Sequence, residues 1–247
     1  MRAAIVTRYG PPDVVTVGET PKPVPGDNEV LIRVHAATVN RTDCGERGAH
    51  PFFARAFYGW FRPNRTILGL DFTGVVEAVG AAVTLFKAGD RVFGMAPSKG
   101  NGAHAEYLCV GEGAPIAPLP DGLGFADGVV CEGAFYANAG LTALRISPGH
   151  RILVYGASGA IGTAAVQLAK YYGAEVTAVV ATRHLLMAER LGADHIIDYA
   201  TAAYRELGPD FDFVHDAVGK MSPLHWRRLL KPGAFSRRPT WGPGARV

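Results

Sequence analysis

The hydrophobic residues divide the chain into two parts, and the first part has a pattern typical of β-structure. Short runs rich in β-branched residues are separated by turns that contain Gly, Pro, Asp and Asn. Several short strands in series indicate an antiparallel barrel or sandwich, which we expect to occupy residues 1–124. The predicted strands cover residues 2–6, 14–17, 29–39, 72–79, 90–95 and 105–110.

The second part, residues 125–247, has strand-like runs that alternate with helix-like runs. Such alternation produces βαβ units, so we expect a parallel, doubly wound sheet and an α/β protein of two domains. The predicted helices cover residues 125–145, 160–172, 183–191 and 220–230, and the predicted strands cover residues 151–155, 175–180, 195–199 and 211–218.

One segment of the first part, residues 50–63, departs from the strand pattern. It contains six aromatic residues among 14. One interpretation is a packed hydrophobic helix or lid, since clustered aromatic side chains usually belong to a core. The other interpretation is an apolar wall for a substrate.

Charge and cysteine content narrow the function classes. The formal net charge is +3, and no Lys/Arg-rich run occurs before the last few residues, so we expect no nucleic-acid partner. Three widely spaced cysteines exclude a disulfide framework and a four-cysteine zinc site, and they favour a reducing, cytoplasmic location. The first residues contain no long apolar run of the kind that a signal peptide needs.

Residues 152–169 are 18 residues without a charge, which is long enough for a membrane span. The segment contains glycines near its middle, which predict a strand, a turn and a helix instead. We therefore expect no membrane partner.

The strongest motif lies within this segment, between a predicted strand and a predicted helix. In such a turn, the first glycine permits a tight bend, the second lets the backbone approach a pyrophosphate, and the third lets the helix pack against the strand. The start of the helix then offers free N–H groups to phosphate. The predicted cofactor-binding residues of this turn are Gly156, Ala157, Ser158, Gly159, Ala160, Ile161 and Gly162.

The end of the following strand indicates which dinucleotide binds. An acidic residue there would hold the ribose 2′-OH of NAD, but the segment 179–184 contains no carboxylate. Thr182 and Arg183 instead offer a hydroxyl and a cation, which suit the 2′-phosphate of NADPH. The alternative is that Arg183 only begins a solvated helix.

Seven segments together carry a family resemblance: Arg8–Val14, Asn28–Val34, Leu68–Val76, Phe86–Val92, Gly140–Leu144, Leu191–Asp194 and Phe213–Gly219. In them the chain resembles the zinc-independent, quinone-oxidoreductase-like branch of the medium-chain dehydrogenase/reductase superfamily. The resemblance covers about residues 1–233. It implies a GroES-like barrel followed by a Rossmann domain, and NADPH-dependent reduction of quinones, enones or related activated carbonyl compounds.

The resemblance also bears on metal binding. Zinc-using relatives carry Cys-Arg-Thr-Asp early and Gly-His-Glu later, where the Cys and the His bind the metal. Here Asn40 stands in place of the Cys and Leu70 in place of the His, so we expect no metal site. Cys44 is out of register with that motif, and His35 and His104 are interpreted as ordinary barrel histidines.

The family's active-site segment corresponds to Asn40, Thr42 and Asp43, which we take as the candidate catalytic residues. Without zinc, hydrogen bonds must polarise the carbonyl, and Asn40 has an amide donor. Thr42 corresponds to the residue that begins a proton relay in zinc-using relatives. Asp43 has two interpretations, an anchor of the local helix or a proton-transfer group.

The resemblance adds three cofactor contacts outside the glycine turn. Thr142 resembles a residue near the nicotinamide and its phosphates. Tyr199 resembles a tyrosine that contacts the 2′-phosphate in some relatives, with a partly buried core tyrosine as the alternative. The loop 216–219, which contains Val218, is expected close to the adenine ribose.

The C-terminal segment departs from the family. Residues 229–233 look like the usual turn into a fifth strand, but residues 234–247 contain three Arg, two Pro and two Gly. We expect them to form no central strand, and the Rossmann domain to be incomplete after about residue 233, as in a truncated or frameshifted product. The family often forms homodimers, through a strand edge that this chain lacks.

Four hypotheses follow for the function. The first is an NADPH-dependent, zinc-independent oxidoreductase. The second is a truncated dinucleotide-binding remnant with little or no catalytic activity. The third is a structural or interaction protein, and the fourth is a zinc alcohol dehydrogenase, which Asn40 and Leu70 disfavour.

Overall fold

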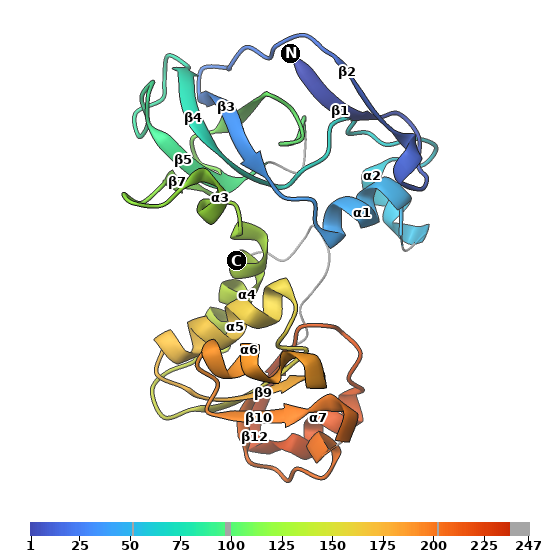
Figure 1. The fold of residues 1–247 in the computed structure, drawn as a ribbon, viewed down its shortest axis with the longest axis vertical. Coiled ribbons are helices and arrows are strands. Elements are labelled where there is room, and N and C mark those ends of the chain that lie inside the picture. Colours follow the sequence, from blue (N-terminus) through green and yellow to red (C-terminus); the bar gives the residue numbers. More distant parts are fainter. Residues whose placement is uncertain (51, 97–99, 202, 238–247) are drawn as a thin grey trace. The chain divides into compact units, whose positions relative to one another are not determined.

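The computed structural model describes residues 1–50, 52–96, 100–201 and 203–237. The chain consists of two compact units, Met1–Cys131 and Glu132–Val247, which Figure 1 shows. The first unit contains the antiparallel strands, and the second contains the parallel sheet with its helices.

The first unit is built around an antiparallel five-stranded sheet with the order β6-β3-β4-β5-β7, and a separate antiparallel pair joins β1 to β2. Val30 and Ile32 of β3 are fully buried in the core, and Leu31 between them is 5% exposed, so residues on both faces of this part of the strand are covered. The predicted antiparallel β-structure is confirmed. The strands are β1 (Arg2–Val6), β2 (Val15–Glu19), β3 (Glu29–Ala37), β4 (Asp71–Val79), β5 (Arg91–Met95), β6 (Tyr107–Gly111) and β7 (Ile116–Pro118).

The three-residue strand β7 was not predicted, because a segment of that length carries no alternation to read. The first unit also contains short helices between its strands. They are the 3₁₀ helices η1 (Pro12–Val14) and η2 (Phe52–Ala54) and the α-helices α1 (Arg41–Gly48), α2 (Arg55–Tyr58) and α3 (Phe125–Gly128).

The aromatic segment 50–63 does not form the packed hydrophobic helix of the first interpretation. Over residues 50 and 52–63, which the structure describes, the helices are η2 and the four-residue α2, and helices this short have no face long enough to bury. Phe61 is 90% exposed, and Phe53 is 70% exposed. The ring of Phe52 does contact Trp60 edge to face, with centroids 6.2 Å apart.

The predicted helix over 125–145 is interrupted, which corrects that prediction. It is divided into α3 and α4 (Cys131–Ala143), with residues 129–130 between them. The Thr73 hydroxyl donates to the carbonyl of Phe125 at 2.7 Å, and that carbonyl would otherwise accept from residue 129 in a continuing helix. A side chain from β4 therefore competes with the helix for its own hydrogen bond.

The second unit contains a parallel five-stranded sheet with the order β10-β9-β8-β11-β12, which corresponds to the first five positions of the Rossmann order 3-2-1-4-5-6. The predicted Rossmann-type sheet is confirmed. In that order β11 and β12 are the fourth and fifth strands. The strands are β8 (Arg151–Tyr155), β9 (Glu175–Val180), β10 (His195–Asp198), β11 (Phe211–Asp216) and β12 (Leu230–Arg237).

Helices cover both faces of this sheet. Side chains of α4, α5 and α6 pack on one face with Ile152 and Val154, while α7 packs on the other with Leu153. Figure 1 shows α5 and α6 on the same side of β9 and β10. The helices are α5 (Ala160–Tyr171), α6 (Leu185–Arg190) and α7 (Pro223–Leu229), with the 3₁₀ helices η3 (Thr182–His184), η4 (Tyr199–Thr201) and η5 (Ala203–Arg205).

The uncharged stretch 152–169 forms β8, a turn and the beginning of α5, as predicted. Over the described residues, no helix combines the length and the apolar character that a membrane crossing requires.

The segment after α7 forms a strand, which corrects one prediction. Residues 229–233 read as a turn in the sequence, yet residues 230–237 form β12, which pairs in parallel with β11. The prediction that residues 234–247 form no central strand is not contradicted, because β12 lies at the edge of the sheet in the described part of the chain. The register shifts between Phe211 and Phe213, and Gly233 has a φ of +83°. A bulge with a left-handed glycine thus accommodates a segment that reads as a turn. Residues 238–247 lie outside the described part of the chain.

Candidate functional site

The turn that precedes α1 contains the three predicted catalytic residues. Asn40 is the N-cap of α1, where its side-chain Oδ1 accepts from the backbone N–H of Asp43 at 3.0 Å. The Asp43 carboxylate in return accepts from the backbone N–H of Asn40 at 3.0 Å. This reciprocal capping box satisfies two amides that the start of a helix would otherwise leave without partners. Thr42 lies in the first turn of α1 and is half-buried.

Asp43 is an anchor in this arrangement. Its carboxylate is 2% exposed, and besides capping α1 it accepts from the backbone N–H of Gly69 at 3.1 Å. It thereby joins α1 to the chain segment that leads into β4. Of the two interpretations drawn from the sequence, this geometry matches the anchoring one, while proton transfer is untested.

Thr38 and Asp71 belong to the same cluster, and no sequence motif pointed to Thr38. The Thr38 hydroxyl donates to Asp71 Oδ2 at 2.9 Å and accepts a long contact of 3.5 Å from Asn40 Nδ2. Asp71 is 3% exposed at the start of β4. Pairing of residues from β3 and β4 depends on sheet register, so no local motif could have revealed this chain of hydrogen bonds.

A buried ion pair lies behind the turn. Glu46 of α1 and Arg65 are 6% and 5% exposed, and Arg65 Nη1 is 3.7 Å from Glu46 Oε2. Burial raises the pKa of Glu46 and lowers that of Arg65, in each case against the pull of the opposite charge. Arg65 Nη2 also donates to the carbonyl of Gly69 at 2.9 Å, so the same backbone segment is held from both sides.

The donor set near Asn40 does not fit a zinc ion. The side-chain oxygen of Asn40 is occupied by the helix cap, and Leu70 offers no ligand atom. The nearby Cys44 is exposed. Over the residues that the structure describes, no group of three or more His, Cys, Asp or Glu side chains could hold a metal ion.

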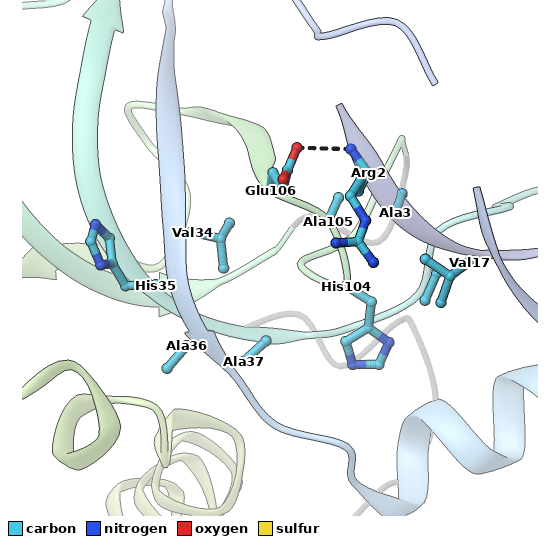
Figure 2. Close-up of a pocket in the computed structure, with 11 residues that line it drawn as sticks. Arg2, Ala3, Val17, Val34, His35, Ala36, Ala37, His104, Ala105 and Glu106 are labelled. Carbon is cyan, nitrogen blue, oxygen red and sulfur yellow. Dashed lines mark hydrogen bonds between the residues drawn. The ribbon is translucent and has the colours of Figure 1, made fainter. Parts of the chain in front are cut away.

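A pocket of about 360 Å³ opens beside the end of β3 (Figure 2). Arg2 and Glu106 lie on one side of it, where the backbone N–H of Arg2 donates to Glu106 Oε2 at 2.8 Å. His35 lines it as well, and its ring stacks on Phe125 with centroids 4.2 Å apart. His104 also contributes to the lining, whereas none of the predicted catalytic residues does in the described chain.

The glycine turn between β8 and α5 depends on the absence of side chains. A Cβ atom on Gly162 would lie 2.2 Å from the carbonyl oxygen of Gly156, and a Cβ on Gly156 would lie 2.1 Å from Val218 Cγ2. Gly156 also has a φ of +76°. The backbone N–H groups of Gly156 and Ala157 both donate to Val179 O at 3.1 Å, which binds the turn to β9.

The start of α5 has the features of an anion site. Gly159 is its N-cap, and no side chain caps the helix there. The first amides of a helix have no partners within the helix, and the helix dipole is positive at that end. The glycine cradle, Ser158 and this open helix start together fit a dinucleotide pyrophosphate.

The remaining predicted cofactor residues follow the carboxyl ends of neighbouring strands. Thr182 and Arg183 come directly after β9 and are exposed, Tyr199 comes after β10, and Val218 follows β11. β9 and β11 flank β8 in the parallel sheet and β10 pairs with β9, so the carboxyl ends of these strands share one edge with the glycine turn. The first turn after β9 contains no acidic residue. The structure thus brings these segments to one side of the sheet.

Thr142 is the exception. Its hydroxyl donates to the carbonyl of Asn138 at 2.7 Å within α4. Asn138 Oδ1 in turn accepts from the hydroxyl of Tyr172, just after the last turn of α5. Thr142 therefore lies toward the far end of α5 from the glycine turn, and the structure does not bring it to the other cofactor residues.

Tyr199 belongs to a cluster of tyrosines. Its ring stacks on that of Tyr204 at 5.8 Å between centroids and meets Tyr155 edge to face at 6.0 Å. Tyr199 is nevertheless 49% exposed, so it is a partly open member of the cluster. Burial and the neighbouring phenols raise the pKa of Tyr155, which therefore stays protonated at neutral pH.

Comparison with known protein families divides the chain into the same two parts. Residues 26–132 match the Alcohol dehydrogenase GroES-like domain family, and residues 160–231 match the Zinc-binding dehydrogenase family. The chain is 36% identical over 231 residues to the 2-methylene-furan-3-one reductase of Solanum lycopersicum, covering 89% of this chain and 58% of that protein. It is 35% identical over 230 residues to the NADPH-dependent alkenal/one oxidoreductase, chloroplastic, of Arabidopsis thaliana, covering 89% of this chain and 58% of that protein.

Among solved structures, the quinone oxidoreductase from Coxiella burnetii is 30% identical with a TM-score of 0.79, covering 89% of this chain and 69% of that chain. The chain thus spans a little over half the length of the two plant relatives and about two-thirds of this bacterial structure. Antiparallel barrel strands, a Rossmann sheet with a glycine turn and these matches agree: the chain belongs to the quinone-oxidoreductase-like family of medium-chain dehydrogenase/reductases.

Proposed function

We propose that the chain is an NADPH-dependent oxidoreductase that reduces quinones, enones or related activated carbonyl compounds by hydride transfer, without zinc. The observation that carries the proposal is the start of α5, an uncapped helix N-terminus walled by Gly156 and Gly162. NADPH, when bound, supplies the hydride. The names of the Solanum, Arabidopsis and Coxiella relatives support the reaction class.

Binding of the cofactor is assigned to the second unit. The amides at the start of α5 would hold the pyrophosphate, and Thr182 and Arg183 would hold the 2′-phosphate. Tyr199, which is 49% exposed, offers a phenol after the neighbouring strand β10, and Val218 covers Gly156. Thr142 is retained only as the family's expectation, since its hydroxyl is used within α4.

Polarisation of the substrate carbonyl is assigned to Asn40. Its amide oxygen is used by the cap of α1, while its amide nitrogen carries two N–H groups and contacts Thr38 with one of them. The second N–H is a donor for a carbonyl oxygen on which negative charge develops. Thr42 is proposed as a second polar group of the same turn, and Asp43 as the residue that keeps the turn in place.

Zinc is not part of the proposed reaction, because the donor set around Asn40 does not suit it. We expect dialysis against EDTA to leave the rate of NADPH oxidation unchanged, and added Zn²⁺ not to raise it. A chelator-sensitive rate that Zn²⁺ restores would favour the zinc alcohol dehydrogenase hypothesis.

A test of activity distinguishes the proposed oxidoreductase from the hypothesis of a truncated dinucleotide-binding remnant. The purified chain is mixed with NADPH and a panel of quinones and enones, and NADPH oxidation is followed by absorbance while binding is followed by NADPH fluorescence. Oxidation with at least one acceptor supports the proposal. Binding without oxidation by any acceptor supports the remnant and overturns the proposed activity.

The cofactor preference is tested at Arg183. Arg183→Ala is expected to raise the Kd for NADPH about tenfold, since a charge-assisted contact to phosphate is lost, and to leave the Kd for NADH unchanged. Arg190→Ala is the matched control, because Arg190 is exposed on α6 away from the end of β9. Equal weakening of both cofactors in Arg183→Ala would contradict the assignment of the 2′-phosphate to this residue.

The cellular location and the oligomeric state are also proposed. We place the reaction in a reducing cytoplasm, where thiols stay free; burial raises the pKa of Cys109 to about 11 and that of Cys131 to about 12, so neither forms a thiolate readily. A homodimer is proposed by analogy with the family, and size-exclusion chromatography with light scattering tests it.

A further inference from the structure

His104, which the sequence suggested was an ordinary barrel histidine, connects several segments of the first unit. Its backbone N–H donates to Leu68 O at 2.9 Å, and its carbonyl accepts from the N–H of Ala4 at 2.8 Å. The residue is therefore fixed between β1 and the segment that precedes β4. Its side chain is 16% exposed, so the ring lies almost entirely inside the unit.

The orientation of the imidazole follows from its contacts. Nε2 lies 2.8 Å from the carbonyl oxygen of Thr38, and a carbonyl only accepts, so Nε2 carries the proton and donates. The ring packs against Gly69, where a Cβ would lie 2.6 Å from His104 Cδ2. Asp43 Oδ2 is 3.8 Å from Nε2, beyond hydrogen-bond distance but close enough to favour a donor on that side.

Thr38 connects the His104 contact to the turn that contains the predicted catalytic residues. It lies two residues before Asn40, and its hydroxyl is the acceptor for Asn40 Nδ2 and the donor to Asp71 Oδ2. Asp71 fixes the side chain of Thr38, but the capping box of Asn40 and Asp43 lies entirely after it. The carbonyl of Thr38 is contacted by His104, and Val39 alone separates Thr38 from Asn40 in the sequence.

We infer that His104 is a positioning residue for the Asn40 amide, because its Nε2–H holds the carbonyl of Thr38 and thereby aims the turn that presents Asn40. The inference rests on the proposed function only for its kinetic consequence. The contact itself belongs to the folded chain and is measurable without turnover.

Three substitutions isolate the role of the donor. Gln is long enough to place an amide N–H where Nε2 lies, Asn is too short to reach Thr38, and Leu fills the space without a donor. We expect His104→Asn and His104→Leu to lower kcat for NADPH oxidation about tenfold through misalignment of Asn40, with KM for NADPH unchanged. His104→Gln is expected to recover most of kcat. His35→Leu is the matched control, because His35 also lines the pocket but stacks on Phe125.

A second measurement is independent of activity. In ¹⁵N NMR spectra of the full chain, His104 is expected to be protonated at Nε2, and His104→Asn is expected to shift the side-chain amide resonances of Asn40. His104→Gln should keep those resonances near their wild-type positions.

Failure of the proposed function and failure of the positioning inference would give different results. If the wild-type chain oxidises no NADPH while the spectra show the expected tautomer and Asn40 shifts, the proposed function fails and the positioning contact stands. A neutral His104 protonated at Nδ1, an unchanged Asn40 amide in His104→Asn, or a parallel loss of kcat in His104→Gln overturns the inference.

Discussion

The turn at Asn40 in the first unit and the glycine turn in the second unit are built in opposite ways. The turn at Asn40 is held by polar side chains that bond to one another and to the backbone, with Asp43, Thr38 and Asp71 as its main members. The turn from Gly156 to Gly162 is held by close backbone contacts that leave no space for a Cβ. The first therefore uses most of its donors and acceptors internally, whereas the second leaves amides available for a ligand.

This difference matters for what each turn can bind. A self-satisfied network fixes one group, the Asn40 amide, in a defined direction and suits a catalytic contact. An open helix start offers several amides at once and suits the several oxygens of a pyrophosphate. Substitutions that remove polar groups should damage the first turn, and substitutions that add atoms should damage the second.

The largest expected effect comes from the ion pair behind the Asn40 turn. Arg65→Met leaves the carboxylate of Glu46 buried without its partner, which should lower the free energy of unfolding by about 3–5 kcal/mol. Urea denaturation measures the change. The double variant Glu46→Leu/Arg65→Met should recover most of the loss, because it removes both charges; a double variant as unstable as the single one would contradict this account.

Buried polar groups also differ between the units. In contrast to the paired charges of the first unit, His215 of β11 is 2% exposed, and its Nε2 has no hydrogen-bond partner among the described residues. Burial lowers the pKa of His215 from 6.5 to about 4, slightly opposed by the charge of Asp216. In the folded state the imidazole is therefore neutral at pH values where the unfolded chain is already protonated.

The second prediction follows from this shift. Because the unfolded state binds more protons between pH 6.5 and pH 4, the free energy of unfolding should fall by about 3 kcal/mol as pH falls through that window. His215→Leu should reduce the pH dependence by that amount. His50→Gln, at an exposed histidine, is the control variant. Parallel curves for wild type and His215→Leu would contradict the prediction.

The third prediction adds one atom to the glycine turn. Gly162→Ala places a methyl group 2.2 Å from the carbonyl oxygen of Gly156, so the backbone must move. We expect a loss of about 1–3 kcal/mol in stability together with weaker NADPH binding. Gly208→Ala is the control, since a Cβ there meets no atom within 4 Å. Unchanged NADPH fluorescence titrations in Gly162→Ala would show that the turn does not depend on this close approach.

The smallest effect separates the two tasks of Asn40. Asn40→Ser keeps an oxygen that caps α1, so its stability should stay within a few tenths of a kcal/mol, whereas Asn40→Ala should lose about 1 kcal/mol. Both variants remove the amide donor, so both should lower kcat with little change in KM for NADPH. Thermal unfolding and initial rates give the two readouts, and a Ser variant with full activity would remove Asn40 from the proposed chemistry.

Much of the fold was predictable because its signals are local. The strands at 2–6, 151–155 and 175–180 match the structure to the residue, since each is a short apolar run bounded by turns. The strand that begins at residue 230 was not predictable, because Pro232 and Gly233 read as a turn and only pairing with β11 makes them part of a strand. The break between α3 and α4, after residue 128, likewise depends on Thr73, which is distant in sequence.

The candidate site divides in the same way. The glycine turn and the residues after β9, β10 and β11 follow from strand ends that any parallel sheet brings to one edge. Thr38 and His104 could not be found, because their roles arise from contacts between β3, β4 and the loop before β6. Thr142 was assigned by resemblance alone. Its position follows from the length of α4, and its neighbours in the sequence carry no signal of that position.

The order of the parallel sheet also sets the order in which the glycine turn can assemble during synthesis. The strands β8, β9 and β10 are neighbours both in the chain and in the sheet, so a nascent chain can pair them as they leave the ribosome. The pairing of β11 with β8 closes a much longer loop and brings Val218 over Gly156 only at that later stage. The topology therefore allows the turn to form early as an open cradle and to be covered from one side last.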